Sequence, residues 1–248
     1  MTERQTRIFC PRALGDDERY TLTGDQHRHI ARVLRLKVGA ALTLFDGRGG
    51  EYAGALEEVH RGQSVVRIRE HRNVENESPI PVRLAQGVSR GERTDYAIQK
   101  AVELGVTSIV PLLTRRGVVQ LDADRAEKRL EHWKGIIVHA FQQCGRNRIP
   151  ELLSVITLEE WLADYECGGV DIVMDPRADS RIGDLDYDAG LVTLLVGPEG
   201  GLDAEEVDAA CAAGFRGITL GPRTLRTETA AIAGVTAIQL KWGDLDAE

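Results

Sequence analysis

One stretch in the last third of the chain restricts the fold more than any other. Leu191–Val196 reads LVTLLV, an apolar run with the length and β-branched content of a strand buried on both faces. A glycine-rich turn, Gly197–Gly201, follows at once and would let backbone groups approach a ligand closely. Strands buried on both faces belong to parallel sheets covered by helices. We therefore expect an α/β fold with a ligand site after this strand.

The next residues add two helices and a strand to the same region. Asp203 and Glu206 are spaced as a capping box, which predicts a helix that ends at Gly214. Ile218–Leu220 predicts a short strand, and a last helix is expected from Thr227. The loop between them carries two arginines, so two strand ends and two loops should converge on one place.

The expected last helix has small side chains on nearly every face. A loop, a ligand or a second subunit could pack closely against it, although core packing would explain the composition equally well. The small residues are Ala230, Ala231, Ala233, Gly234 and Ala237.

Length and charge set the outer limits. A chain of 248 residues with 42% hydrophobic content favours two domains, and the net charge of −8 means that any nucleic-acid contact must come from a local patch. The four cysteines are widely spaced without a CxxC pair, which indicates reduced, mostly buried thiols and no metal site. No apolar run approaches the roughly 20 residues of a membrane span. We expect a cytoplasmic protein without a membrane partner.

The first part of the chain predicts a small β-barrel. Five short β-rich segments lie close together, and Asp46–Gly50 has the composition of a hairpin turn. One helix, capped by Asp25, interrupts them and should bury an apolar stripe of Ile30, Val33 and Leu34. The five segments are Thr6–Cys10, Arg19–Thr23, Ala41–Phe45, Tyr52–Val59 and Ser64–Glu70.

Four cations, Arg28, Arg32, Arg35 and Lys37, cluster on and just beyond this helix. In an acidic protein such a cluster indicates contact with phosphates, although a solvated helix face is the plainer alternative.

A polar, proline-bearing segment, Asn73–Pro81, is the expected domain boundary. We place a first domain at 1–73, a linker at 74–81 and a second domain at 82–248. Strands and helices alternate beyond the boundary, which predicts a mostly parallel sheet with its ligand outside the carboxyl ends of the strands. Further expected elements are the strands Val82–Val88, Ser108–Pro111, Leu152–Ile156 and Val170–Met174, and the helices Thr94–Leu104, Asp124–Cys144 and a short one capped by Thr157 and Glu160.

The glycine-rich turn and the arginine loop together resemble a known family. GPEGG, with LRTETA at Leu225–Ala230, looks like the cofactor-binding half of the SPOUT methyltransferases, and is most similar to the RsmE family of 16S ribosomal RNA uridine N3-methyltransferases. Gln142 and Thr224 depart from the residues usual in that family. The resemblance extends over nearly the whole chain through Gln99–Val106, Gln143–Arg146, His29–Arg35 and Phe45–Gly47.

The resemblance implies a fold and a reaction. The fold would be an N-terminal PUA-like β-barrel for RNA, followed by a C-terminal SPOUT α/β domain with a mostly parallel sheet and a trefoil knot. The cofactor would be S-adenosyl-L-methionine, the substrate 16S rRNA or the small ribosomal subunit, and the assembly a homodimer. N3 of one uridine would be methylated, without a metal because a sulfonium is already activated.

Arg226 is our candidate catalytic residue, a fixed cation that would stabilise the uracil oxygens when N3 loses its proton. Alternatively, an ion pair with Glu199 or Glu228 would merely hold the loop. The same two carboxylates are the nearest candidates for the proton acceptor, and the sequence does not choose between them. The expected cofactor-binding residues are Met174, Val196, Gly197, Pro198, Gly201, Leu220, Gly221, Leu225, Thr227 and Ala230.

N3 lies on the pairing edge, so a paired uridine must be unstacked or flipped before it can react. Cations could hold the flanking phosphates, and the expected RNA-binding residues are Arg28, Arg32, Arg35, Arg93 and Arg146.

Two other functions fit parts of the sequence. A non-catalytic RNA-binding protein explains the barrel and the basic helix but leaves GPEGG without a role. A methyltransferase acting on a ribose 2′-hydroxyl fits the C-terminal half equally well, whereas the PUA-like first domain favours the base methylase.

Overall fold

The computed structural model describes residues 6–15, 18–118 and 122–246. These form two compact units. Unit 1 holds the described residues up to Glu77 together with 141–149, and unit 2 holds 78–140 and the described residues from Pro150 onward. The segment 141–149 thus joins the first unit from far along the chain.

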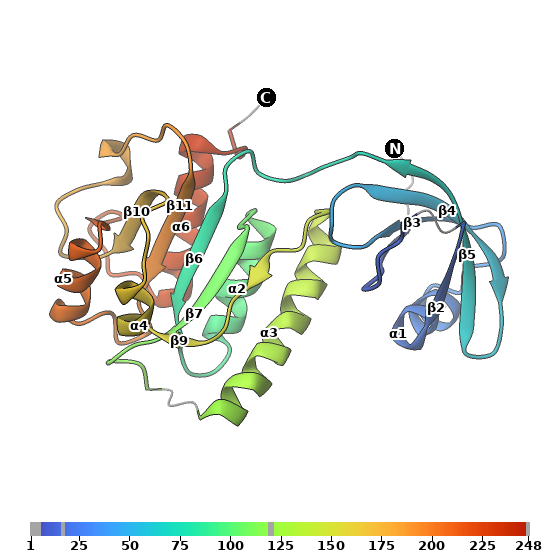
Figure 1. Ribbon diagram of the computed structural model, residues 1–248, viewed down its shortest axis with the longest axis horizontal. Coiled ribbons are helices and arrows are strands. Elements are labelled where there is room, and N and C mark those ends of the chain that lie inside the picture. Colours follow the sequence, from blue (N-terminus) through green and yellow to red (C-terminus); the bar gives the residue numbers. More distant parts are fainter. Residues whose placement is uncertain (1–5, 16–17, 119–121, 247–248) are drawn as a thin grey trace. The chain divides into compact units, whose positions relative to one another are not determined.

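Unit 1 is a five-stranded mixed sheet that forms a half-barrel (Figure 1). The strand order is β1-β3-β4-β5-β2, in which β1 runs parallel to β3 and the remaining pairs are antiparallel. Its core is aliphatic, with Leu22, Leu42 and Leu44 fully buried. The strands are β1 (Thr6–Phe9), β2 (Arg19–Thr23), β3 (Ala41–Phe45), β4 (Glu51–Val59) and β5 (Gln63–Arg72).

The basic helix differs from its expected form. It begins as α1 (Gly24–Arg28) and continues as a π-helical turn, η1 (His29–Val33), in which the Leu34 amide donates to the His29 carbonyl at 2.9 Å. The wider turn changes the direction of the side chains that follow. Ile30 is fully buried, but Val33 is 66% exposed and Leu34 39% exposed. The predicted apolar stripe is therefore wrong beyond Ile30.

The segment 141–149 is fixed in unit 1 by aromatic packing and an ion pair. Phe141 packs edge-on against Phe9 and Phe45, with ring centroids 5.8 and 5.3 Å away. Arg146 is buried and pairs with Glu77 at 2.6 Å. A buried arginine with a carboxylate partner holds the fold together at this point.

Unit 2 is a parallel sheet with helices on both faces. The order is β12-β10-β11-β6-β7-β8, with β9 also paired to β7, and every pairing is parallel. This confirms the predicted α/β architecture. The strands are β6 (Val82–Gly87), β7 (Ser108–Leu113), β8 (Glu151–Leu152), β9 (Ile156–Thr157), β10 (Gly169–Met174), β11 (Leu191–Val196) and β12 (Arg216–Ile218), and the helices are α2 (Arg93–Glu103), α3 (Ala123–Cys144), α4 (Leu158–Ala163), η2 (Ile182–Asp184), α5 (Ala204–Ala212) and α6 (Thr227–Trp242).

The alternation of side chains along β11 shows which helices cover which face. Leu194 lies against Gly234 of α6, where a Cβ would come within 2.6 Å of a Leu194 methyl carbon. Its neighbour Leu195 packs with Leu158 of α4 and Ala210 of α5 in a separate buried cluster. Successive residues of a strand point to opposite faces, so α6 covers one face and α4 with α5 the other.

Two expected strands differ in the structure. The predicted strand at Ile218–Leu220 lies two residues earlier, at Arg216–Ile218, and the Thr219 amide beyond it donates to the Ser180 carbonyl. The predicted strand Leu152–Ile156 is two short pairings, β8 and β9. Both predicted capping boxes, at the starts of α4 and α5, are confirmed.

Within the described ranges, the structure contains neither a helix long and apolar enough to cross a membrane nor a group of three or more metal-ligating side chains. Cys10 is buried, but Cys167 and Cys211 are exposed, so the expectation of mostly buried thiols is wrong for those two.

Candidate functional site

A cavity of about 570 Å³ opens in unit 2 beyond the carboxyl ends of β10, β11 and β12. The chain runs from the central strand β6 outward in one direction to β7 and β8, and later returns to place β11 and β10 on the other side of β6. The cavity thus lies near the point where the strand order reverses, the usual ligand position in open α/β sheets. Its volume is suited to a small organic cofactor.

The glycine-rich turn packs so closely on the end of β6 that side chains would collide. A Cβ on Gly87 would lie 2.5 Å from the Pro198 nitrogen, and one on Gly197 would lie 2.8 Å from the Leu202 nitrogen. Gly201 has a φ of +67°, a left-handed conformation that favours glycine. These glycines hold the backbone of the turn at the cavity wall.

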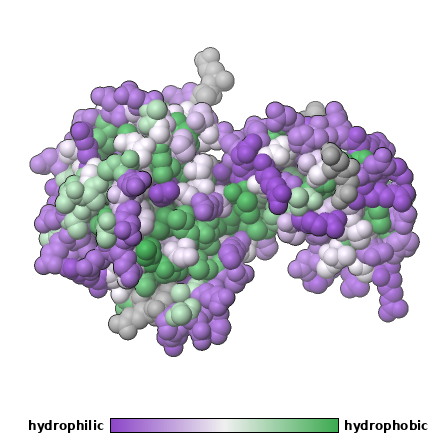
Figure 2. Space-filling view, in the orientation of Figure 1, coloured by the Kyte–Doolittle hydropathy of each residue, from purple (hydrophilic) through white to green (hydrophobic). Residues whose placement is uncertain are grey.

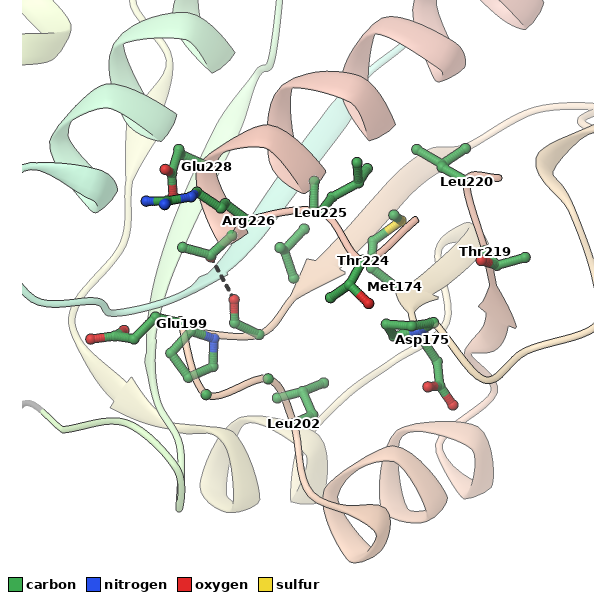
Figure 3. A pocket seen from close by; sticks show the side chains of 18 of the residues that line it. Met174, Asp175, Glu199, Leu202, Thr219, Leu220, Thr224, Leu225, Arg226 and Glu228 are labelled. Carbon is green, nitrogen blue, oxygen red and sulfur yellow. Dashed lines mark hydrogen bonds between the residues drawn. The ribbon is translucent and has the colours of Figure 1, made fainter. Parts of the chain in front are cut away.

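A chain of buried hydrogen bonds joins this turn to the start of α6. The Thr227 hydroxyl donates to the Gly197 carbonyl at 2.6 Å (dashed line in Figure 3), and the Gln86 side-chain amide donates to the Thr227 hydroxyl at 2.9 Å. Residues far apart in sequence, from β6, the turn and α6, are thereby held in one arrangement.

The structure brings nearly all of the predicted cofactor residues together. Apolar side chains from three strand ends and from α6 line the cavity with backbone of the glycine-rich turn between them. Gly221 alone among the ten lies outside the lining, in the loop after β12. The predicted residues on the wall are Met174, Val196, Gly197, Pro198, Gly201, Leu220, Leu225, Thr227 and Ala230.

Arg226 also lines the cavity, as the residue that precedes α6. Its side chain makes no ion pair within the described part of the chain, so the alternative of a salt bridge that merely holds the loop has no support here. Figure 3 draws Arg226 and Glu228 at one side of the cavity, opposite Asp175 and Thr219. A cation without a fixed partner can act on a bound ligand.

Glu199, from the glycine-rich turn, is firmly held. Its Oε1 accepts a hydrogen bond from the Arg90 amide at 3.2 Å and lies 3.7 Å from the Arg93 guanidinium. Burial would raise the pKa of Glu199, but hydrogen bonds from backbone amides and the charge of Arg93 outweigh it and hold this pKa below its ordinary value. The carboxylate is therefore charged at neutral pH.

Asp175 lines the cavity without having been predicted. Both of its carboxylate oxygens are taken by the Arg177 guanidinium, at 2.9 and 3.2 Å. Burial would raise the pKa of Asp175, yet the hydrogen bonds and charge of Arg177 lower it overall. Because Asp175 directly follows the β10 strand end, the strand-end rule could have identified it.

Other lining residues carried no usable signal in the sequence. Arg116 reaches the cavity from the loop after β7 and lies at its wall beside Gly200, whose Cβ would be 3.0 Å from the Arg116 carbonyl. Its position depends on β7 being only two strands away from β11, and the order of strands is not readable from one sequence.

The five predicted RNA-binding arginines occupy three different places. Arg28, Arg32 and Arg35 are exposed on and just after the α1/η1 helix of unit 1, where Arg28 pairs with Asp25 at 2.9 Å. Arg93 lines the cavity of unit 2. Arg146 is only 3% exposed and paired with Glu77, so it supports unit 1 from within and leaves no charge at the surface. Figure 2 shows mostly hydrophilic residues on the visible surface of unit 1, while the visible face of unit 2 also exposes a broad hydrophobic area.

Comparison with known proteins gives two family matches. A model described as an RNA methyltransferase domain matches residues 76–239, and one described as an RNA methyltransferase PUA domain matches residues 22–69. Together they span most of both units.

Individual relatives match over almost their full length. The ribosomal RNA small subunit methyltransferase E of Buchnera aphidicola (Schizaphis graminum strain) is 34% identical, over 99% of this chain and 100% of the relative. The crystal structure of the enzyme of the same name from Neisseria gonorrhoeae, bound to S-adenosyl methionine, is 36% identical with a TM-score of 0.90, covering 97% of this chain and 99% of that one. A Legionella pneumophila structure with bound cofactor SAM is 37% identical with a TM-score of 0.92, covering 98% and 100%.

Proposed function

Because the chain belongs to the ribosomal RNA small subunit methyltransferase E family, we propose that it transfers a methyl group from S-adenosylmethionine to ribosomal RNA. The finer part of the proposal is that the acceptor is N3 of one uridine in 16S rRNA of the small subunit. The single observation that carries the proposed methyl transfer is the cavity at the strand ends of unit 2, and the finer choice of uridine N3 is supported by Arg226 in the cavity wall.

The cavity residues fit S-adenosylmethionine on structural grounds. Its wall combines apolar side chains such as Met174 and Leu225 with exposed backbone of the glycine-rich turn, which suits an adenosine held through backbone groups. The turn packs closely on the end of β6, because neither Gly87 nor Gly197 has room for a Cβ. When bound, the cofactor supplies an activated methyl group on a sulfonium.

Arg226 would serve the acceptor base. N3 of uridine is a weak acid, and its loss of a proton spreads negative charge onto O2 and O4. A guanidinium at the cavity edge, free of a carboxylate partner in the described chain, can stabilise that charge and align the base. The other lining arginines, Arg93, Arg116 and Arg223, would extend the positive surface toward the neighbouring phosphates.

RNA contacts in unit 1 would come from the α1/η1 helix. Arg28, Arg32 and Arg35 present three exposed guanidiniums within one short stretch of an otherwise acidic chain. Arg35 has a φ of +50°, a conformation that non-glycine residues seldom adopt and that is found at functional turns. Arg146 is left out of this proposal because it is buried.

The proposal also includes a homodimer in the cytoplasm. Tyr96 of α2 is 47% exposed and Leu240 of α6 is 51% exposed, and these two helices pack on one another. Apolar groups on adjoining helices are compatible with an interface on this side of unit 2. The trefoil knot stays a prediction from the family resemblance.

Methylation of a ribose 2′-hydroxyl is the second candidate, since the cavity and glycine-rich turn would serve it as well. A 2′-hydroxyl is reached from the backbone without unpairing the base, whereas N3 requires the base to be extruded. The exposed cations of unit 1 could hold the RNA at several phosphates while the base is extruded. This feature favours methylation at N3.

The proposed function is tested with the purified protein, S-adenosylmethionine carrying a labelled methyl group, and separated ribosomal subunits from cells that lack this enzyme. We expect label in the RNA of small subunits and little in that of large subunits. Calorimetric titration with S-adenosylmethionine is run in parallel. If S-adenosylmethionine binds but no methyl group is transferred to either subunit, the proposed substrate is wrong. If S-adenosylmethionine does not bind, the proposed cofactor is wrong.

A further inference from the structure

Two carboxylates line the cavity around Arg226, and their partners differ. Glu199 is held through its Oε1 atom, which accepts from the Arg90 amide at 3.2 Å and lies 3.7 Å from the Arg93 guanidinium. Glu228 is not: its Oε2 atom is shielded from solvent and has no hydrogen-bond partner among the described residues. A buried carboxylate oxygen is nearly always hydrogen-bonded in folded proteins, because leaving it unpaired after its removal from water is unfavourable.

The third carboxylate of the cavity, like that of Glu199, has a partner within the chain. Asp175 gives both oxygens to Arg177, and Figure 3 draws it on the side opposite Arg226. Glu228 lies in the first turn of α6, two residues after Arg226, and Figure 3 draws these two side chains on the same side. Of the three acidic residues, Glu228 alone combines a position beside the proposed base-binding arginine with an acceptor that the folded chain leaves unused.

We propose that Glu228 is the proton acceptor of the reaction, a catalytic residue that receives the N3 proton of the target uridine. The inference rests on the proposed function, because it assigns one step of that transfer. The N3–H bond breaks and the proton goes to the Glu228 carboxylate; the electron pair left on N3 forms the new bond to the methyl carbon, while the donor sulfur keeps the pair of the broken carbon–sulfur bond. The proton passes to water after the methylated base has left the cavity.

The division of roles between neighbouring charges follows from this step. Arg226 would meet the negative charge that develops on the uracil oxygens while Glu228 takes up the proton, so the pair handles both products of the ionisation. Glu199 would stay charged throughout and keep Arg93 in place. The remaining charged side chains on the cavity wall are Arg116, Asp175, Arg177 and Arg223.

The test compares Glu228→Gln with Glu228→Asp, Glu199→Gln and a matched control. The control is Glu205→Gln, the same change in the first turn of α5 and outside this cavity. Each variant is measured for thermal unfolding, for S-adenosylmethionine affinity, and for the single-turnover rate of methyl transfer to small subunits over a range of pH. The first two measurements report folding and cofactor binding independently of the chemistry.

With the amide at position 228 we expect the neutral-pH rate to fall about 100-fold or more, with cofactor affinity and thermal stability kept. The lost rate should return as the pH rises, by about tenfold per pH unit, because solvent base then removes the proton. Glu228→Asp should retain part of the rate with a pH profile closer to that of the wild type. Glu199→Gln and Glu205→Gln should keep the wild-type shape of the profile.

Two results would overturn the assignment while leaving the proposed function intact: a Glu228→Gln rate close to that of the wild type, or a loss that stays constant with pH. A wild-type protein that binds the cofactor but transfers nothing to uridine N3 would instead remove the proposed function, and this inference with it.

Discussion

Arg226 is the residue on which the proposed chemistry depends most. It makes no ion pair in the described chain and lines the cavity. We expect Arg226→Ala to leave S-adenosylmethionine affinity nearly unchanged, because the cofactor contacts are assigned to backbone and apolar groups. Methyl transfer should fall about 100-fold or more, the usual effect of removing one charge-stabilising donor. Calorimetry and single-turnover kinetics on the same preparation measure the two effects.

Arg226→Lys serves as the control, because it keeps the charge but loses the planar pair of donors. Its rate of methyl transfer should lie between that of the wild type and that of Arg226→Ala. Turnover that survives in Arg226→Ala would show that the arginine only supports the loop.

A substitution at Gly87 tests whether the glycine-rich turn forms part of the cofactor-binding wall. A methyl group there would meet the Pro198 nitrogen at 2.5 Å, so Gly87→Ala must displace the backbone of the turn. We expect a loss of about 1–3 kcal/mol in the free energy of unfolding and a clear fall in cofactor affinity. The measurements are denaturant unfolding and titration with S-adenosylmethionine.

Gly135→Ala is the matched control, because it lies in α3 with nothing within 4 Å of the added carbon. It should stabilise the protein by about 0.5–1 kcal/mol. Unchanged cofactor affinity in Gly87→Ala would mean that the turn does not form the binding wall.

Whether the sequence identifies a site residue depends on the segment in which that residue lies. Nine of the ten expected cofactor residues line the cavity because they lie in segments that end strands or begin α6. Asp175 was missed although it directly follows such a strand. Arg116 and Gly87 could not have been found, since their roles depend on which strands are neighbours. Arg146 was misread because sequence alone does not separate a buried arginine from a surface one.

At the scale of elements, the packing of α6 on the sheet explains one of its small residues. Gly234 packs on Leu194 of β11, with room for no Cβ, so close packing between helix and sheet explains this position. Gly234→Ala should lower the free energy of unfolding by about 1–3 kcal/mol, despite the better helix propensity of alanine. Denaturant unfolding measures the change.

The double variant with Leu194→Ala identifies the cause. If the two residues are in contact, the loss from Gly234→Ala should be smaller in the Leu194→Ala background than in the wild type. Equal losses in both backgrounds would contradict a direct clash, and a stabilising effect of Gly234→Ala would show that the helix has spare room.

The elements themselves were predicted unevenly. Strands with strong alternation or continuous apolar runs, such as β3 and β11, begin and end where expected, and the capping boxes identified α4 and α5. The π-helical turn η1 was not foreseeable, because its residues fit an ordinary helix equally well. It turns Val33 outward to 66% exposure, which a regular helix pattern had placed in the core.

At the scale of the whole molecule, the sequence does not predict that residues 141–149 belong to unit 1. Phe141 belongs to the same apolar helix face as Trp133 and Ile137, yet it packs against the aromatic rings of β1 and β3. A two-domain division read along the chain assigns that segment to the second domain, whereas the contacts assign it to the first.

The proposed homodimer is tested by sedimentation equilibrium over a range of protein concentrations. We expect twice the mass of the single chain at micromolar concentration, with Tyr96→Glu shifting the population toward the monomer, because a charge would have to be buried beside α6. The Glu205→Gln variant should sediment like the wild type. A monomer at all concentrations would contradict the dimer and leave the cavity assignment unaffected.

The most direct test of the central claim is to identify the modified nucleoside. Small ribosomal subunits from cells that lack this enzyme are incubated with the protein and S-adenosylmethionine, and their 16S rRNA is digested and analysed by mass spectrometry against nucleoside standards. We predict N3-methyluridine at a single site, absent when Arg226→Ala replaces the wild type. A 2′-O-methylated nucleoside, or unmodified RNA despite cofactor binding, would contradict the account.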